Sequence, residues 1–341
     1  MDPVKKDIHG IDRDIHRVLS NVRNNTELQP GTKKILLGLY EVVRQTNKKS
    51  TSCNHIVNLY VLAKDNPGMN FSDLKKKNVK KLSKQIRERN IHGNTKYKYG
   101  NSLRRLLLYS KKEKYSKYVV FGRVPGKKKT ASDILSSEDV IQLILAGRDV
   151  EEKAFIASTF EGGFRIGEIG TIGIGDVRQE EVGISLAVSG KTGERRSRLI
   201  VAAAYFEKWL SEHPDKNNMD APVWIKNGKQ MMYPAFVKII KRVSKLTGLE
   251  KKVHLHLLRH SGCTNAANHM TESQMREYFG WSGDSAMPMI YVHLSKMDVD
   301  RSVLKQHGIE LDVVVDRFTV RKCEMCGHFT PIFEERCVYC V

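Results

Sequence analysis

A short segment rich in lysine, proline and glycine, residues 119–132, divides the sequence into two parts of different charge. Residues 1–130 hold 31 basic and 10 acidic side chains, whereas residues 131–310 hold 23 of each. The surplus behind the formal net charge of +20 therefore lies in the first third of the chain. We expect residues 119–132 to link two folded units, the first of which binds a polyanion such as a phosphate backbone.

The first part has the pattern of a small helical domain. Apolar residues recur at helical spacing in four segments between residues 31 and 118, and Asn66-Pro67-Gly68 and His92-Gly93-Asn94 separate these segments. Many of the polar positions are lysine or arginine with few acidic residues to balance them, which favours DNA as the partner. Residues 1–30 predict one further amphipathic helix, and its pattern fits packing or partner contact equally well.

The second part, residues 133–310, predicts a mainly helical domain with a small antiparallel sheet. Ser136 is the expected N-cap of its first helix, and a second helix covers residues 151–161. Residues 182–189 alternate between apolar and polar side chains, and with residues 196–201 they predict a β-hairpin. Helices are expected at 203–212, 233–247, 256–269 and 271–280. The predicted fold class is α+β, mostly α.

Several residues of this second part have side chains suited to phosphate chemistry. Arg165 follows two glycines at the start of a helical turn, and Lys191 lies at the tip of the predicted hairpin. His256 and Arg259 are three positions apart on one helix face. Each of these, like Trp281 and Tyr291, has an ordinary structural explanation when it is considered alone.

Taken in order, these residues form a more specific pattern: GxRxxE at 163–168, GK at 190–191, HxxRH at 256–260, GW at 280–281 and IY at 290–291. The pattern resembles the tyrosine recombinase, or phage integrase, family over residues 31–310. The resemblance implies a SAM-like helical core-binding domain followed by a catalytic domain that acts as a DNA strand transferase. It also implies the catalytic set Tyr291, Arg165, Lys191, His256, Arg259 and Trp281.

The chemistry of strand exchange explains why these residue types are needed. Rejoining a strand without an energy cofactor requires a covalent protein–phosphate intermediate, and a phenol such as Tyr291 is a good leaving group in the second step. Arg165 and Arg259 can each bind a non-bridging phosphate oxygen. By the resemblance, Lys191 protonates the leaving 5′ oxygen and His256 exchanges the nucleophile's proton or orients the phosphate.

Two further residues take roles by the same resemblance, and the sequence departs from the usual pattern at two points. Trp281 donates its indole N–H to the phosphate, and Glu168 holds the fold around the first arginine. Trp281 and Tyr291 are ten positions apart, one more than is common, and glycines surround the segment after Arg165. His254 and His260 flank the HxxR pair, but without an acidic ligand beside them the spacing does not favour a metal site.

The last residues, 311–341, predict a zinc ribbon. Cys323 and Cys326 form one CxxC pair and Cys337 and Cys340 form another, ten residues further on. Chance pairs or a redox motif are the alternatives, but so short a tail needs a metal to fold. We expect one structural zinc and neither a catalytic metal nor a nucleotide. The tail is similar to cysteine knuckles of some archaeal recombinases, and we expect it to aid protomer contact or DNA docking.

The sequence thus predicts a site-specific recombinase or integrase that forms a 3′-phosphotyrosine on double-stranded DNA as a tetramer. A mobile element of archaea, viral or plasmid, is the expected source. A type IB topoisomerase and a non-catalytic zinc-ribbon DNA-binding regulator are the alternatives. The sequence has neither a signal peptide nor an apolar run of membrane-spanning length, so we expect a cytoplasmic, nucleoid-associated protein without a membrane partner.

Overall fold

The structure is a computed structural model that describes residues 4, 7–125, 130–190, 193–295, 303–304, 306–309 and 316–340. The chain divides into two compact units. Gly10–Lys127 forms the first, called here the helical unit. Met1–His9 and Lys128–Val341 form the second, called here the mixed unit because it contains both helices and strands. The chain therefore starts in the mixed unit, passes through the helical unit and returns.

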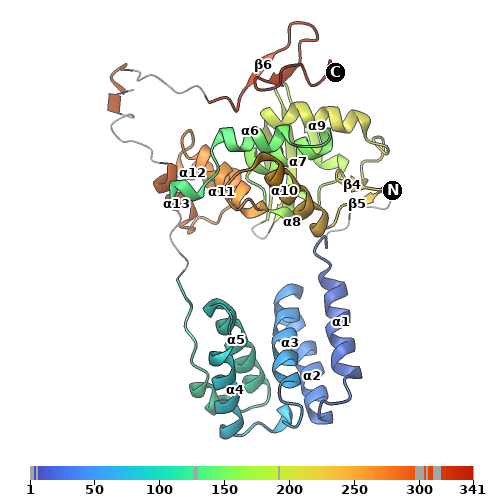
Figure 1. The fold of residues 1–341 in the computed structure, drawn as a ribbon, viewed down its shortest axis with the longest axis vertical. Coiled ribbons are helices and arrows are strands. Elements are labelled where there is room, and N and C mark those ends of the chain that lie inside the picture. Colours follow the sequence, from blue (N-terminus) through green and yellow to red (C-terminus); the bar gives the residue numbers. More distant parts are fainter. Residues whose placement is uncertain are drawn as a thin grey trace. The chain divides into compact units, whose positions relative to one another are not determined.

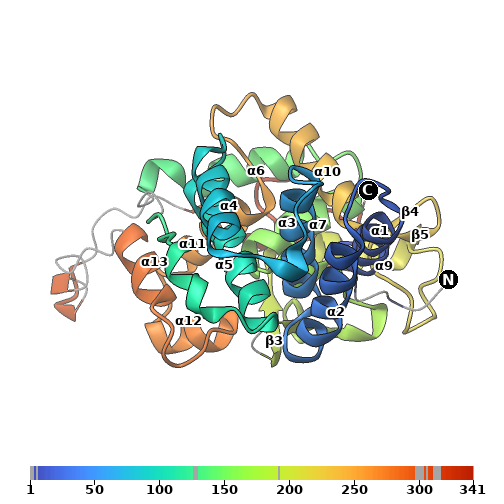
Figure 2. The ribbon, with the colours of Figure 1, turned by 90° about the horizontal axis from the view of Figure 1, so that it is seen from below.

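The helical unit is a bundle whose central helix is α3. Figures 1 and 2 both place α3 between α1 and α2 on one side and α4 and α5 on the other, and α3 contacts α1, α2 and α5. Short 3₁₀ turns lie at Phe71–Asp73 and Glu113–Tyr118. The helices are α1 (Ile11–Asn24), α2 (Pro30–Thr46), α3 (Lys49–Lys64), α4 (Lys76–Glu88) and α5 (Gly93–Tyr109).

Helix α1 belongs to the core of the helical unit. Its residues Ile15, Val18, Leu19 and Val22 are buried because positions three, four and seven apart share one helix face. The boundary expected at residue 30 therefore falls inside this unit, and Pro30 is the first residue of α2, where its missing N–H has no cost. Of the two interpretations open for residues 1–30, the structure shows packing.

The mixed unit is mostly helical, as the sequence predicts, and carries small antiparallel sheets. No helix among the residues that the structure describes is long and apolar enough to cross a membrane. The helices are α6 (Ser137–Leu145), α7 (Val150–Glu161), α8 (Ile166–Ile169), α9 (Val201–Glu212), α10 (Tyr233–Thr247), α11 (Leu255–Ala266), α12 (Glu272–Phe279) and α13 (Met287–Ser295), with 3₁₀ turns at Ala131–Asp133 and Ile174–Asp176. The strands are β1 (Val177–Gln179), β2 (Ile184–Gly190), β3 (Gly193–Leu199), β4 (Ile225–Lys226), β5 (Lys229–Gln230), β6 (Val320–Lys322) and β7 (Phe329–Pro331).

The predicted hairpin is the main sheet of this unit. Strands β2 and β3 pair antiparallel from Ile184 opposite Leu199 to Gly190 opposite Gly193, and β1 adds a third strand that the sequence analysis did not predict. Burial does not alternate at the start of β2, because the polar Ser185 is also buried, and it donates to Glu180 Oε1 at 2.7 Å. The second strand begins and ends earlier than expected, because Val201 already opens α9.

The core of the mixed unit surrounds α7, which contacts α6, α9 and α11. Phe155 of α7 packs against Trp224 and Phe236, with ring centroids 5.6 and 4.7 Å away. The first residues of the chain complete this core. Ile8 is 1% exposed, contacts Gly170 and accepts a hydrogen bond from Tyr233 N at 2.9 Å.

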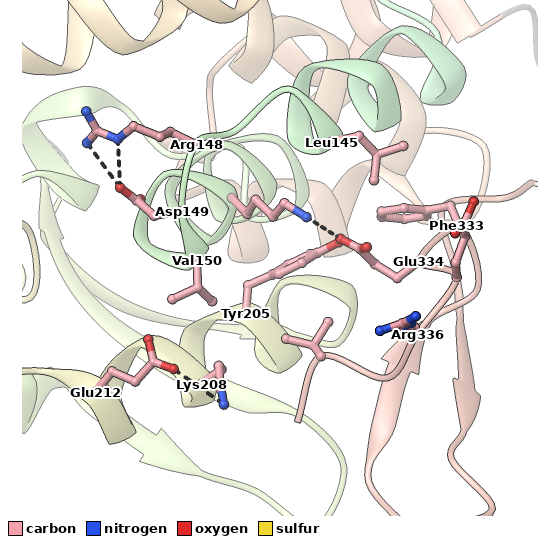
Figure 3. Close-up of a pocket in the computed structure, with 13 residues that line it drawn as sticks. Leu145, Arg148, Asp149, Val150, Tyr205, Lys208, Glu212, Phe333, Glu334 and Arg336 are labelled. Atoms are coloured by element: carbon pink, nitrogen blue, oxygen red, sulfur yellow. Dashed lines mark hydrogen bonds and ion pairs between the residues drawn. The ribbon is translucent and has the colours of Figure 1, made fainter. Parts of the chain in front are cut away.

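The C-terminal strands β6 and β7 form a hairpin that lies against α7 and α9 of the same unit. Phe318 packs edge-on against Phe160 at 4.9 Å. Glu334 accepts hydrogen bonds from Lys153 Nζ at 2.7 Å and from Tyr205 Oη at 2.8 Å, beside a cavity of about 620 Å³ shown in Figure 3. The hairpin is thus anchored by both apolar and charged contacts.

Candidate active site and metal centre

Arg165 is positioned by a short helix and a buried carboxylate. Helix α7 ends at Glu161 with Gly162 as its C-cap, and Gly163 follows with φ 52°, a left-handed conformation that favours glycine. Arg165 is the N-cap of α8, and Glu168 accepts its backbone N–H at 2.9 Å and its Nη1 at 2.6 Å. The side chain of Arg165 stays 36% exposed, so the guanidinium is fixed but accessible.

Gly170, one of the glycines after Arg165, allows close packing, whereas Gly167 has open space around it. A Cβ at Gly170 would meet the carbonyl of Ile166 and the side chain of Ile8, each at 2.7 Å. The chain can therefore turn tightly behind α8, while Glu168 holds Arg165 from within the same turn.

Glu168 joins three arginines. Besides Arg165, it accepts a hydrogen bond from Arg195 Nη2 at 3.0 Å and lies 3.7 Å from Arg259 Nη1. Its side chain is 2% exposed, and this burial raises its pKa. The hydrogen bonds from Arg195 and Arg165 outweigh burial and leave the pKa of Glu168 below its ordinary value. The carboxylate therefore stays ionised between its cationic partners.

Arg259 is a buried cation with one unused donor. It lies on α11 and is 3% exposed, and its Nη1 donates to the carbonyl of Gly163. Burial lowers the pKa of Arg259. Among the residues that the structure describes, its Nη2 has no hydrogen-bond partner. A buried guanidinium with a free donor is a suitable group to bind an anion.

Trp281 lies between Arg259 and Tyr291. Its ring is 5.9 Å from the guanidinium carbon of Arg259 and stacks on Tyr291, with centroids 5.4 Å apart and planes 7° apart. Tyr291, on α13, is 1% exposed. Burial is the main cause that raises the pKa of its phenol, so the resting tyrosine is neutral. The ten-residue separation between Trp281 and Tyr291 thus allows the two rings to stack face to face.

The predicted histidine lies beside a second one. His256 is exposed, and its ring centroid lies 4.2 Å from that of His260. His260 Nδ1 is 2.6 Å from Tyr291 Oη. His256 and Arg165 also line a cavity of about 490 Å³ next to Lys241 and Lys252. By the resemblance, His256 exchanges the nucleophile's proton or orients the phosphate, whereas the ring in contact with the phenol is that of His260.

The structure brings together Arg165, Arg259, Trp281 and Tyr291, with His256 one ring away. The predicted Lys191 lies outside the described residues, and strands β2 and β3 on either side of it end at the paired Gly190 and Gly193.

Sequence reasoning missed Arg195 and gave His260 no role. A signal for Arg195 was present, because alternation along a half-buried strand places it on the same face as Ser197 and Leu199. An arginine pointing inward from a strand requires a buried acceptor. His260 is four positions from His256 and so shares its helix face.

Comparison with known proteins agrees with this arrangement. Residues 134–297 match the sequence model of the Phage integrase family. Residues 134–297 of the mixed unit belong to the phage integrase family. Tyrosine recombinase XerD of Oceanobacillus iheyensis is 24% identical over 185 residues, which are 50% of this chain and 61% of that protein. Transposase A from transposon Tn554 of Staphylococcus aureus is 24% identical over 216 residues, 59% of this chain and 58% of the relative. The chain thus spans less than two thirds of the length of these relatives.

Solved integrase structures share the fold. A lambda integrase dimer bound to a COC′ core site has a TM-score of 0.61 at 12% identity, covering 86% of this chain and 83% of that one. The Tn1549 transposon integrase in complex with transposon right end DNA has a TM-score of 0.57 at 17% identity, covering 80% and 98%.

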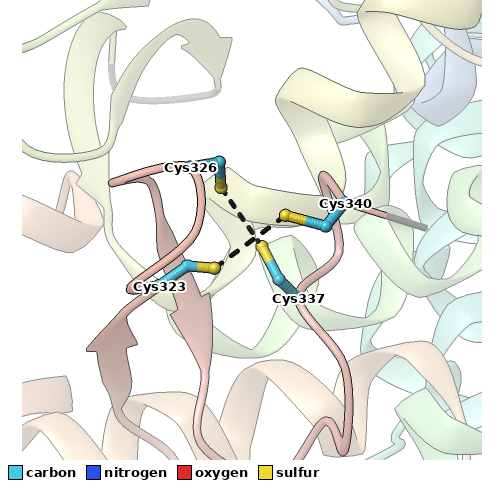
Figure 4. Close-up of side chains that lie close together, drawn as sticks. All are labelled: Cys323, Cys326, Cys337 and Cys340. Carbon is cyan, nitrogen blue, oxygen red and sulfur yellow. Dashed lines mark hydrogen bonds between the residues drawn. The ribbon is translucent and has the colours of Figure 1, made fainter.

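The four C-terminal cysteines form a compact cluster. Their sulfur atoms all lie within 4.8 Å of one another, with 3.9 Å between Cys323 and Cys340 and 3.6 Å between Cys326 and Cys337 (Figure 4). A tetrahedral zinc with Zn–S bonds of ~2.3 Å separates its sulfurs by about 3.8 Å. Backbone N–H groups of Cys326 and Met325 lower the pKa of Cys323, which favours the thiolate. This donor set fits a closed, four-sulfur metal site.

Proposed function

We propose that this chain is a site-specific DNA recombinase that cuts and rejoins DNA strands through a 3′-phosphotyrosine at Tyr291. The observation that carries the proposal is Arg259 Nη2, a buried donor without a hydrogen-bond partner among the described residues, beside Trp281 and Tyr291. An unsatisfied buried donor costs ~1–3 kcal/mol. A non-bridging phosphate oxygen would satisfy it, and charge-assisted hydrogen bonds of this kind are about twice as strong as neutral ones.

The reaction follows from the residues that surround this donor. The phenol oxygen of Tyr291 forms a bond to phosphorus, and the bond from phosphorus to the 5′ oxygen breaks. Arg165 and Arg259 stabilise the charge that gathers on the phosphate oxygens, and loss of one comparable donor costs ~3–4 kcal/mol in other enzymes. The indole N–H of Trp281 adds a further donor. The reverse attack by a 5′ hydroxyl rejoins the strand, so the phosphodiester energy is kept.

Lys191 completes the catalytic set in this proposal. A 5′ alkoxide is a poor leaving group, and a lysine ammonium can supply its proton. The β2–β3 hairpin that carries Lys191 is anchored to the same carboxylate as Arg165, because Arg195 of β3 donates to Glu168. This shared anchor supports a common role for Lys191 and the arginines. His256, the remaining predicted residue, exchanges protons at the exposed edge of the site.

Double-stranded DNA is the proposed substrate, and a mobile element is the proposed source. Six exposed lysines on and beside α4 present positive charge on one helix, and Tyr118 packs under two of them. Residues 31–118 would hold the duplex through its phosphates and residues 133–310 would cut it. The proteins that this chain resembles include a transposase and a transposon integrase, which supports a role in DNA mobility. We also propose that the protein acts on DNA as a tetramer and that the mobile element is archaeal.

The cysteine cluster holds one structural zinc in this proposal. Zinc would fix the β6–β7 hairpin, because so few residues cannot fold by apolar burial alone. Cys323, Cys326, Cys337 and Cys340 would fill all four positions, so the site has no place for a substrate. The contacts of Phe318 and Glu334 with α7 and α9 support a role in stabilising the chain's own mixed unit.

A covalent trapping experiment tests the proposed function. A library of nicked duplexes of randomised sequence releases a short fragment on cleavage, so each protein–DNA adduct is trapped and its sequence can be read. We expect adducts from the unmodified protein and none from Tyr291→Phe. Tyr278→Phe is the matched control, because Tyr278 is a partly buried tyrosine on the neighbouring helix α12 and its hydroxyl donates to the carbonyl of Arg198. If the unmodified protein forms no adduct, the chain is a DNA-binding regulator and the proposal is wrong.

A second measurement separates recombination from a type IB topoisomerase. The trapped sequence is placed once, twice or not at all in a supercoiled plasmid. A recombinase exchanges strands between two copies of the sequence, whereas a topoisomerase relaxes the plasmid without any copy.

A further inference from the structure

The phenol of Tyr291 contacts a histidine to which the proposed function gives no task. Tyr291 Oη lies 2.6 Å from His260 Nδ1, within the range of a strong hydrogen bond. The ring planes are tilted by 42° with centroids 5.7 Å apart, so the contact is made through polar atoms at the ring edges. His260 therefore touches the oxygen that would attack the phosphate.

The position of His260 follows from the helix that carries the arginine. His256, Arg259 and His260 lie on α11, and side chains four positions apart point to one face. The ring centroids of His256 and His260 are 4.2 Å apart, and the two ring planes are inclined by 68°. The rings thus form a row from the exposed His256 through the half-buried His260 to the buried Tyr291.

We propose that His260 accepts the phenolic proton of Tyr291 when the strand is cut and returns it when the strand is rejoined. This inference rests on the proposed function. In the cutting step the O–H bond of Tyr291 breaks and its proton moves to Nδ1 of His260, which becomes an imidazolium. The same oxygen bonds to phosphorus, and the 5′ oxygen leaves with a proton from a separate donor. His256 lies on the solvent side of His260 and connects it to water.

The groups around Tyr291 explain why a neutral base is needed. Burial is the largest effect and raises the pKa of the phenol, and the nearby Cys263 raises it further. Arg259 and Arg165 lower it but leave it above its ordinary value. Cys263 is no alternative base, because burial raises the pKa of its thiol to about 12. His260 has an imidazole nitrogen within hydrogen-bond distance of the phenol oxygen, and a neutral imidazole nitrogen can accept a proton.

Two variants of His260 separate proton transfer from simple orientation. In His260→Asn the amide oxygen falls near the position of Nδ1, so the hydrogen bond to Tyr291 is retained but no proton can be accepted. In His260→Ala the ring is removed and its space is left open. His269→Asn, at an exposed histidine beyond the end of α11, is the matched control. The folding of each variant is checked by thermal unfolding and by its binding to the trapped DNA.

The readout is the single-turnover rate of adduct formation at saturating protein, between about pH 5.5 and 9.5. We expect both His260 variants to cut 10²–10⁴-fold more slowly at neutral pH, the usual range for loss of a general base. Their rates should keep rising with pH, because hydroxide replaces the lost base, whereas the unmodified protein should level off. Added imidazole should restore part of the rate in His260→Ala and none in His260→Asn, where the space is filled.

Three outcomes would overturn the inference while the proposed function stands. Cutting by His260→Asn at the unmodified rate and with an unmodified pH profile would show that orientation is sufficient. Faster cutting by either variant would show that His260 restrains a resting tyrosine. A slow His260→Ala that imidazole does not restore, together with a normal His260→Asn, would indicate a packing role. Absence of adducts from the unmodified protein would instead refute the proposed function itself.

Discussion

Arg195 Nη2 lies 3.0 Å from Glu168 Oε2, so a strand residue holds the carboxylate that also fixes Arg165. The side chain of Arg195 is 8% exposed, and its Nε donates to the carbonyl of Tyr278 at 2.9 Å. Tyr278 belongs to α12, which leads directly to Trp281. One arginine therefore connects the β2–β3 hairpin, Arg165 and the segment before Trp281.

Replacement of Arg195 should disturb both stability and cutting. We expect Arg195→Ala to lower the free energy of unfolding by ~3–5 kcal/mol, because it leaves Glu168 charged and less paired in a buried place. Chemical unfolding measures this change. Arg196→Ala, at an exposed position on the same strand, is the control and should change stability by less than about 1 kcal/mol. In a double-mutant cycle, Glu168→Gln should remove most of the effect; additive losses would contradict the pairing.

Replacement of Trp281 should separate packing from phosphate binding. Trp281→Phe keeps an aromatic ring against Tyr291 but removes the indole N–H. We expect its folding to be close to that of the unmodified protein and its cutting rate to fall ~10²-fold or more, as for other lost transition-state donors. Trp281→Ala should in addition lose ~3–5 kcal/mol of stability. Unfolding curves and single-turnover adduct rates check both variants, and normal cutting by Trp281→Phe would exclude the indole as a donor.

Zinc removal should act on the C-terminal hairpin first. We expect one zinc per chain by elemental analysis, and Cys323→Ser should reduce this content below one. Cys53→Ala, at a buried cysteine of the helical unit, should leave it unchanged. Chelation should release the hairpin from α7 and α9, seen as faster amide exchange in those helices and faster proteolysis after residue 316. A chain that keeps the same exchange rates without metal would show that the hairpin folds independently of zinc.

Glu151 should make the mixed unit less stable as pH rises. Its carboxyl accepts a hydrogen bond from Ile225 N at 2.7 Å, and burial raises its pKa to about 8. Because the folded pKa is the higher one, the folded state binds the proton more tightly, and stability falls as pH rises from about 4.5 to about 8. Across this window the free energy of unfolding should fall by at most about 1.4 kcal/mol for each pH unit.

Unfolding of Glu151→Gln across this range checks the sign. We expect the variant to be more stable than the unmodified protein near pH 8, because an amide keeps the acceptor for Ile225 without a charge to bury. Glu212→Gln, at an exposed carboxylate, should leave the slope unchanged. An unchanged slope in Glu151→Gln would show that this carboxyl is not the group that titrates.

Much of this architecture could be predicted because short stretches of sequence indicate where its helices and strands begin and end. The cap at Ser136, the glycines after α7 and the alternation in β2 each predict an element that forms at its expected place. The four cysteines could be recognised by spacing alone. Arg165, Arg259, Trp281 and Tyr291 could be named as a set because their order along the chain is distinctive.

The remaining features depend on contacts between distant residues. Arg195 meets Glu168 from 27 positions away, and His260 meets Tyr291 from 31 positions away, so no local pattern could reveal either pair. The short strand β1 has three residues and forms only because β2 offers an edge. The destination of Ile8 was equally hidden, since its spacing to Ile11 and Ile15 is that of one helix face and predicts that it belongs to the amphipathic helix of residues 1–30.

The docking of Ile8 against Gly170 has a practical consequence for dissecting this protein. A fragment that starts after the linker contains every motif of the recombinase pattern. It lacks Ile8, however, whose side chain packs against Gly170 at the end of α8. Such a fragment would expose the apolar surface of Gly170 and Phe236 directly behind Arg165. The helical unit is, in topological terms, an insertion between the segment that carries Ile8 and the rest of the mixed unit.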